Sequence, residues 1–476
     1  MHRILMFFKG LHYMRIALVL FLGLLLSSCS IPQPLLEQIK EAGELVVITR
    51  NSPTTYFHEG EEIRGLEYEL VQQFAEELGV EVKYVIPESF DQIIPAIKKG
   101  EAHFAAAGLG ITKPRELSVR FTPSYQTVTS QLVYKGGNRR PKKIDETNGG
   151  ALEIVAGSSH EEQLRKLKKT YPDLQWTAQR SVESAELLTL VKEGLIDYTI
   201  ADSNEVALSR RFHPELKVAF DLGEERKLAW AFPHAEDSSL YRAAVDYFRR
   251  IEKDGSLEQM VERYYGYVEK LGFVDKRTFV RHMAQRLPPL VPLFKQAAQE
   301  NGVDWKLLAA IGYQESHWNP EAVSPTGVRG VMMLTSATAK QMGVDDRTDT
   351  EQSIMGGARY LVRMEQKIPD RIQEPDRTWL ALAGYNVGFG HLEDARILTQ
   401  RGGGDPDKWA DVKRHLPLLS KKKYYKTVKH GFARGGEPVH YVDNIRNYYD
   451  LLVWHNNREE KARKRTAVVN SLPRLL

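Results

Sequence analysis

Glu315 is the carboxylate of this sequence best placed to donate a proton. Asp304 is a preferred helix-capping residue and Pro320 stops helix propagation, so a helix is predicted between them. Leu307, Ile311 and Glu315 are spaced by four residues and therefore share one face of that helix. Apolar surroundings disfavour the charged form of a carboxylate and raise its pKa, which suits a general acid. The alternative is a glutamate at a helix end that simply reaches solvent.

Three sequence blocks, in a fixed order, favour the general acid. The run ESHWNPEAVSPTGVRGVMML, at 315–334, resembles the signature of the soluble lytic transglycosylase and goose-lysozyme superfamily. The run ALAGYNVGFG, at 381–390, resembles the A-x-Y-N-x-G block of that superfamily. The run EPVHYVDNI, at 437–445, resembles its terminal E-T-x-x-Y-V-x-x-I block. The resemblance implies a lytic transglycosylase that acts on peptidoglycan glycan strands.

The resemblance further implies that Glu315 is the only catalytic residue. It would first protonate the glycosidic oxygen between N-acetylmuramic acid and N-acetylglucosamine. It would then accept the proton of the muramic acid 6-hydroxyl, which attacks C1 and leaves a 1,6-anhydro end. An ordinary glycoside hydrolase uses two carboxylates. The sequence excludes no second one, and Glu437 is a candidate, so a lysozyme-type hydrolase and a non-catalytic wall-binding sensor remain as alternatives.

The same resemblance assigns supporting roles to five other residues. Ser324 matches a serine that hydrogen-bonds near the catalytic acid, and Tyr385 matches a tyrosine beside it. Asn386 would bind sugar or fix its loop, and Tyr441 matches the tyrosine of the last block. Met333 stands where the superfamily usually has glutamine, so a polar substrate contact is absent or replaced. A capped turn or a packed ring is the structural alternative for each.

Aromatic residues near these blocks are candidates for stacking on sugar rings. Tyr313, Trp318 and Phe389 offer rigid apolar faces, although packing in a protein core is an equally good explanation. The histidines and the single cysteine show no metal-ligand spacing, and no phosphate-binding loop is present. We therefore expect neither a metal nor another cofactor.

The elements that must position these residues fall into two regions. Over 44–268, apolar strand runs alternate with amphipathic helices, which predicts an α/β domain with a mainly parallel sheet. Beyond residue 278 the strand runs stop, and helical periodicity predicts a mainly α domain, as in lysozyme-like folds. The net charge of +4 is too small to indicate a nucleic-acid partner.

Two blocks in the first region resemble the extracellular solute-binding proteins of the polar-amino-acid type. They are GLEYEL, at 65–70, and ITKPRELSVRFT, at 111–122. The resemblance implies a two-lobed, periplasmic-binding-protein-like fold with a ligand between the lobes. Arg115 would hold an α-carboxylate and Asp202 an amino group, whereas a surface salt bridge and a helix N-cap are the alternatives. We expect a muropeptide or an amino acid as ligand, and a regulatory role for this domain.

The N-terminal segment is typical of an exported protein. Basic residues precede an apolar run at 16–26, which is typical of a secretory signal. The following Leu-Ser-Ser-Cys resembles a lipobox, so Cys29 is predicted to be lipidated, at the outer membrane and facing the periplasm. An ordinary signal peptide with a chance cysteine is the alternative. The predicted organisation is a signal peptide (1–29), a tether (30–43), the solute-binding-like domain (44–268), the catalytic domain (269–455) and a basic, disordered tail (456–476).

Overall fold

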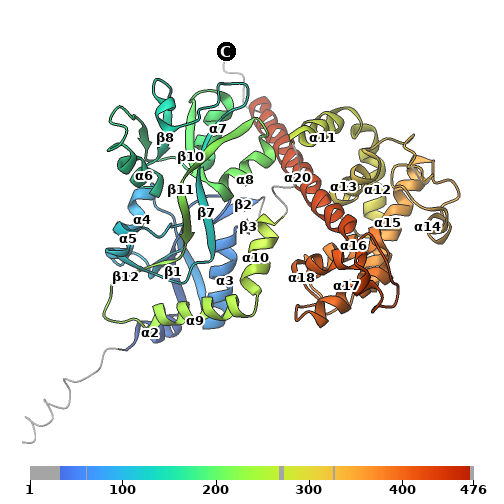
Figure 1. The fold of residues 1–476 in the computed structure, drawn as a ribbon, viewed down its shortest axis with the longest axis horizontal. Helices are drawn as coiled ribbons and strands as arrows, with labels where there is room; N and C mark the ends of the chain where they lie inside the picture. The colour runs from blue at the N-terminus through green and yellow to red at the C-terminus, as the bar shows by residue number, and fades with distance from the viewer. Residues whose placement is uncertain (1–32, 60–61, 267–272, 325–326, 472–476) are drawn as a thin grey trace, which may run out of the picture.

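The computed structural model describes residues 33–59, 62–266, 273–324 and 327–471 (Figure 1). The predicted signal peptide and Cys29 lie outside these residues. None of the helices in the described ranges combines the length and apolar character that a membrane span requires. The predicted fold class is confirmed: a two-lobed α/β domain is followed by a mainly helical domain.

The first lobe is built on a five-stranded sheet in the order β4-β1-β5-β12-β6. Strand β1 is parallel to β4 and β5, whereas β12 runs antiparallel to β5 and β6. The strands are β1 (Glu44–Ile48), β4 (Glu81–Val85), β5 (Phe104–Ala105), β6 (Val119–Phe121) and β12 (Ala231–Pro233). Its smaller elements are α2 (Leu35–Ala42), β2 (Phe57–Glu59), β3 (Glu62–Arg64), α3 (Leu66–Leu78), α4 (Ile93–Lys98) and α5 (Lys113–Glu116).

The second lobe has a sheet in the order β11-β7-β10-β8-β9. Both sheets are mixed, so the prediction of a mainly parallel sheet was wrong. The reason is that the chain crosses into this lobe along β7 and returns along β11, which pairs antiparallel with β7. The elements are β7 (Gln126–Lys135), β8 (Leu152–Val155), α6 (Ser159–Leu167), β9 (Thr177–Gln179), α7 (Ser184–Glu193), β10 (Tyr198–Asp202), α8 (Ser203–Phe212) and β11 (Leu216–Leu228).

Helices α9 (Ser239–Lys253) and α10 (Ser256–Tyr265) pack against the first lobe and lead to the second domain. That domain surrounds one hydrophobic core. Its helices are α11 (Phe273–Gln285), α12 (Val291–Asn301), α13 (Trp305–Ser316), α14 (Ser336–Gln341), α15 (Thr350–Lys367), α16 (Asp376–Val387), α17 (Phe389–Arg401), α18 (Trp409–His415), α19 (Lys422–Tyr425) and α20 (Gly436–Ser471).

The last helix, α20, crosses the middle of the molecule and packs against α13 and α16 (Figure 1). It continues to Ser471, within the segment that was predicted to form a basic, disordered tail. The part of this helix before residue 457 includes Val442, Ile445 and Leu452, which are buried in the core of the second domain.

Candidate active site and binding cleft

Helix α13 holds Glu315 in its last turn. Asp304 caps the start of the helix and accepts a hydrogen bond from a first-turn N–H at 2.8 Å, as predicted. After the helix, His317 and Trp318 both have left-handed backbone angles, with φ of 53° and 56°. Side chains other than glycine rarely adopt this conformation, and such strain clusters at functional sites. The Trp318 indole fixes the turn by donating a hydrogen bond to the Ala309 carbonyl at 2.7 Å.

The Glu315 side chain is partly buried, and Tyr441 and Tyr385 lie close to its carboxyl group. Tyr441 Oη, from α20, donates a hydrogen bond to Glu315 Oε1 at 2.7 Å. The ring of Tyr385, from α16, lies nearly parallel to that of Tyr441, with 6.3 Å between their centroids. Burial raises the pKa of Glu315 to about 7, and the hydrogen bond from Tyr441 partly opposes this shift. Near neutral pH the group is therefore populated both as an acid and as a base.

The remaining predicted residues lie in different environments. Asn386 is exposed. Its neighbour Tyr385 is buried, and the Tyr385 hydroxyl has no hydrogen-bond partner among the described residues. Ser324 Oγ accepts a hydrogen bond from the Val328 backbone N–H at 2.9 Å, within the turn that follows α13. Met333 is partly exposed and has a left-handed backbone angle, with φ of 45°. Among the contacts described for the predicted set, those of Tyr441 and Tyr385 are the ones that involve Glu315 or its immediate partner.

Two of the predicted sugar-stacking residues are core residues. Tyr313 and Trp318 are 2% and 1% exposed, and both pack against Phe279. Core packing, the alternative stated for these residues, therefore applies to both, because their faces are covered by protein. Phe389 is partly buried, with Lys367 Nζ 5.2 Å from its ring centroid. The candidate second carboxylate, Glu437, is exposed and pairs with a neighbouring arginine on the surface.

The predicted ligand residues lie in the cleft of the first domain, where Arg115 is buried. Its guanidinium donates to Glu162 Oε1 at 3.0 Å, to the Gly157 carbonyl at 3.0 Å and to the Gly110 carbonyl at 3.2 Å. Arg115 belongs to the first lobe, whereas Glu162 and Gly157 belong to the second. The salt bridge that was the alternative interpretation of Arg115 is therefore present, but it lies in the cleft between the lobes rather than on the surface.

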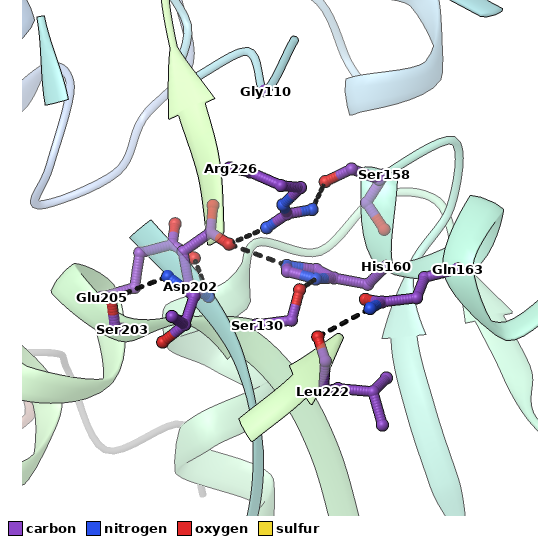
Figure 2. A network of polar contacts seen from close by, with 12 residues as sticks. Gly110, Ser130, Ser158, His160, Gln163, Asp202, Ser203, Glu205, Leu222 and Arg226 are labelled. Carbon is purple, nitrogen blue, oxygen red and sulfur yellow. Dashed lines mark hydrogen bonds and ion pairs between the residues drawn. The ribbon is translucent and has the colours of Figure 1, made fainter. Parts of the chain in front are cut away.

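Asp202 is the N-cap of α8, as its alternative interpretation stated, and it also faces the cleft (Figure 2). Its carboxylate forms an ion pair with Arg226, from β11, and lies 3.6 Å from His160 Nε2. His160 Nδ1 lies within hydrogen-bond distance of Ser130 Oγ, at 3.1 Å. Burial, and then the neighbouring arginines, lower the pKa of His160 well below its usual range, so this imidazole is neutral.

Further ion pairs hold the two lobes together. Arg50, from the first lobe, donates to Glu183 at 2.9 Å and to Glu205 at 2.5 Å, both from the second lobe. Beside Arg50 and Asp202 the cleft leaves no room for a water molecule. Because the charged groups of the cleft are paired with one another, a ligand must displace at least one of these pairs.

Several residues of this cleft were not predicted. Glu162, Arg226, Glu205 and Arg50 belong to no recognised block, and their partners are distant in sequence. The sequence does contain a signal for Glu67, because this carboxylate falls on the apolar face of the helix α3. In the structure it is buried and accepts a hydrogen bond from the Gly108 N–H at 2.7 Å. Burial raises the pKa of Glu67 to about 7. Among the described residues, no group of three or more metal-ligating side chains is placed to hold a metal ion.

Two protein families match separate parts of the chain. Residues 45–267 match the bacterial extracellular solute-binding proteins, family 3. Residues 292–406 match the family described as Transglycosylase SLT domain. Solved structures similar to the chain include an ancestral arginine-binding protein bound to arginine, with a TM-score of 0.43, 24% identity and coverage of 47% of this chain and 98% of that one.

Curated relatives extend over both parts. "Membrane-bound lytic murein transglycosylase F" of Pseudomonas fluorescens is 49% identical over 434 residues, which cover 91% of this chain and 89% of the relative. The protein of the same name from Saccharophagus degradans is 46% identical and covers 90% of this chain and 85% of the relative. These matches define a class of fusion protein in which a solute-binding domain precedes a transglycosylase SLT domain. The chain belongs to the membrane-bound lytic murein transglycosylase F family.

Proposed function

We propose that this chain, a lytic murein transglycosylase that acts on peptidoglycan, cleaves the β-1,4 bond between N-acetylmuramic acid and N-acetylglucosamine. The observation that carries the proposal is the partly buried Glu315, which has a pKa of about 7 and a hydrogen bond from Tyr441. A group poised at neutral pH can donate a proton and then accept one in the same turnover. The family membership supports the same reaction.

In this mechanism Glu315 first donates its proton to the glycosidic oxygen, and the bond from that oxygen to C1 of the muramic acid breaks. The 6-hydroxyl oxygen of the same sugar then forms a bond to C1 and gives its proton to the Glu315 carboxylate. The acid is thereby regenerated and no water is consumed. Tyr441 stabilises the carboxylate between the two proton transfers, because its hydroxyl donates to Oε1.

Mass analysis of the products from purified peptidoglycan tests the reaction type. A transglycosylase releases muropeptides that are lighter by one water than those of a hydrolase. Products with reducing ends would identify a lysozyme-type hydrolase instead. If the wild-type protein released no product at all, the non-catalytic sensor would be the better account.

Replacing Tyr441 with phenylalanine is expected to lower turnover about tenfold and to shift its pH dependence. The hydroxyl hydrogen bond holds the pKa of Glu315 below the value that burial alone would give. Its loss raises that pKa, so the alkaline limb of the pH–rate profile moves to higher pH, and one pKa unit corresponds to about a tenfold change in the equilibrium. A profile that keeps its wild-type limbs would contradict this role.

We propose that the cleft of the first domain binds a wall-derived peptide or an amino acid and that binding modulates catalysis. Arg115 and Asp202 are both buried in the cleft, where they would meet the carboxylate and the amino group of a ligand. Ligand-dependent activity requires that the ligand prefers one arrangement of the two domains over the other. Glu162 and Arg226 pair with the two residues in the structure, so the ligand would replace these side chains.

Replacing Arg115 with alanine is expected to weaken ligand binding about tenfold or more, because hydrogen bonds to charged groups are among the stronger ones. Calorimetry of the full chain with free amino acids and with purified muropeptides measures the effect. Arg165→Ala is the matched control, since Arg165 lies on α6 and is 71% exposed. The proposal fails if wild-type protein binds none of these compounds, or if both variants bind them equally well.

We propose that the polypeptide divides into a signal peptide (1–29), a tether (30–43), the solute-binding-like domain (44–268), the catalytic domain (269–455) and a basic tail (456–476). We further propose that Cys29 is lipidated and holds the protein at the outer membrane, facing the periplasm. The lipobox-like sequence and the membrane-bound relatives support this location. The Cys29→Ser variant is then expected in the soluble fraction after cell lysis, whereas retention in the membrane fraction would indicate a different anchor.

A further inference from the structure

A basic loop at residues 421–434 carries a strong local positive charge. It contains five lysines, one arginine and no acidic residue, whereas the whole chain has a net charge of +4. The rest of the chain is therefore negative by two charges. The lysines are exposed, and none of them has an ion-pair partner among the described residues: Lys421, Lys422, Lys423, Lys426 and Lys429. A concentration of positive charge of this kind attracts an anionic partner.

The backbone of the basic loop is fixed to the helical domain. The carboxylate of Asp394, on α17 and 1% exposed, accepts from the Lys429 N–H at 3.1 Å and from the His430 N–H at 2.7 Å. Arg401, at the end of the same helix, donates to the Thr427 carbonyl at 3.0 Å. The lysines therefore project from an ordered surface, and little of the chain has to be ordered when a partner binds.

Phe432 lies within the basic loop and is 57% exposed. Its ring meets that of Tyr425 edge to face, with 5.7 Å between their centroids. A single exposed apolar side chain is ordinary on a protein surface. An exposed aromatic ring in a segment rich in lysine, however, is typical of surfaces that bind lipid headgroups. An acidic peptide would pair with the lysines, but it offers no apolar layer for Phe432.

The position of the basic loop agrees with a membrane partner. Helix α17, which holds the loop through Asp394, and α2, the first described helix, both lie at the lower edge of the molecule in Figure 1. Leu35 opens α2 and follows Cys29 by six residues, which span about 20 Å at most. A lipid at Cys29 would therefore keep this edge of the first domain close to the membrane, on the same side as α17.

We propose that the basic loop binds the anionic headgroups of the phospholipid surface to which Cys29 is anchored, with the Phe432 ring at the boundary between headgroups and acyl chains. The inference rests on the proposed lipid anchor and adds a second contact, which lies in the catalytic domain. Salt screens a contact of this kind, so it orients the protein at the membrane but does not hold it there without the lipid. The catalytic domain is thereby kept beside the membrane.

Co-sedimentation with lipid vesicles tests this contact. The protein is the polypeptide from Ser30 to Leu476, which contains every described residue and lacks the proposed anchor. The vesicles consist of phosphatidylcholine, with or without phosphatidylglycerol. At low salt we expect the wild-type protein to bind only the vesicles that contain phosphatidylglycerol, and we expect high salt to release it.

Two triple variants of equal net charge separate the basic loop from the charge of the whole chain. The first carries glutamine in place of three loop lysines, and its binding is expected to weaken about tenfold or more: Lys422, Lys423 and Lys426. The control carries glutamine in place of three exposed lysines of the second lobe, and it is expected to bind like the wild type: Lys142, Lys166 and Lys169. Because all these side chains are exposed, both variants keep the fold.

The variant Phe432→Ser tests the apolar part of the contact. It leaves the charge unchanged, and we expect it to weaken binding about threefold or more. Wild-type binding by Phe432→Ser would overturn the inference, because the choice of lipid as partner depends on this ring.

Three further results would also overturn the inference. They are equal binding to both kinds of vesicle, equal effects of the two triple variants, and binding to peptide-bearing wall fragments but to neither kind of vesicle. The last result would identify an acidic wall partner instead. Failure of the proposed anchor is seen separately, when the full-length Cys29→Ser variant stays in the membrane fraction after a wash at high salt.

Discussion

Replacing Glu315 with glutamine is expected to lower the turnover of peptidoglycan by about 10³-fold or more. General acid–base catalysis contributes about 10²- to 10⁴-fold to a rate, and here one group provides both the acid and the base. Glutamine preserves the size of the side chain and can still accept from the Tyr441 hydroxyl, so the fold is retained. The loss of rate therefore measures the proton transfers themselves.

The same substitution is expected to stabilise the protein at alkaline pH. The folded-state pKa of Glu315 is about 7, above the ordinary value of 4.5. The unfolded chain therefore loses its proton first, and stability falls as the pH rises from 4.5 towards 7. Glu315→Gln removes this loss, so we expect a gain of about 1–2 kcal/mol at pH 8 and little change at pH 4.

The control for both effects is Glu437→Gln. Glu437 lies in the terminal block of the same domain but is 61% exposed. We expect wild-type turnover and wild-type stability for this variant. If Glu437→Gln also lost activity, a second carboxylate would take part in the reaction, and the single-residue mechanism would be wrong.

Replacing Arg446 with methionine is expected to reduce the free energy of unfolding by about 3–5 kcal/mol. Arg446 is 2% exposed, and its guanidinium pairs with Glu262 and donates to the Arg263 carbonyl. Its charged group also lies 5.0 Å from the centre of the Trp379 ring. Methionine fills much of the volume but leaves Glu262 with one cation fewer. Urea unfolding followed by circular dichroism measures the difference.

Arg434→Met is the matched control for this substitution. Arg434 is 75% exposed and forms a surface ion pair with Glu437, with 3.3 Å between Nη1 and Oε1. Exposed ion pairs contribute at most about 1 kcal/mol, so we expect almost no change. Equal effects of the two substitutions would mean that the ion pair between Arg446, on α20, and Glu262, on α10, adds no stability to the folded protein.

The parts of the site that could be predicted depend on local sequence. The cap at Asp304, the spacing of Leu307, Ile311 and Glu315, and the helix end before Pro320 all act within one helix, and the predicted α13 is observed. The raised pKa of Glu315 follows from the same apolar stripe. Tyr385 and Tyr441 were found because they belong to recognisable blocks, although the blocks themselves do not reveal that the two rings lie together.

The parts that could not be predicted depend on contacts between distant residues. The charge of Arg226 is neutralised by Asp202, and the charge of Arg115 by Glu162, and these partners are 24 or more residues apart in sequence. An arginine that will be buried looks like any surface arginine in the sequence. For the same reason, composition gave no indication that Tyr313 packs in the core rather than lining a sugar-binding groove.

Digestion of peptidoglycan in water labelled with ¹⁸O tests the central claim most directly. Mass spectrometry of the products shows whether the oxygen of the solvent has been added to C1 of the muramic acid. The mechanism with Glu315 as acid and then base predicts anhydro ends that contain no label. Labelled reducing ends would show that water is the nucleophile, and would contradict the claim that the 6-hydroxyl attacks.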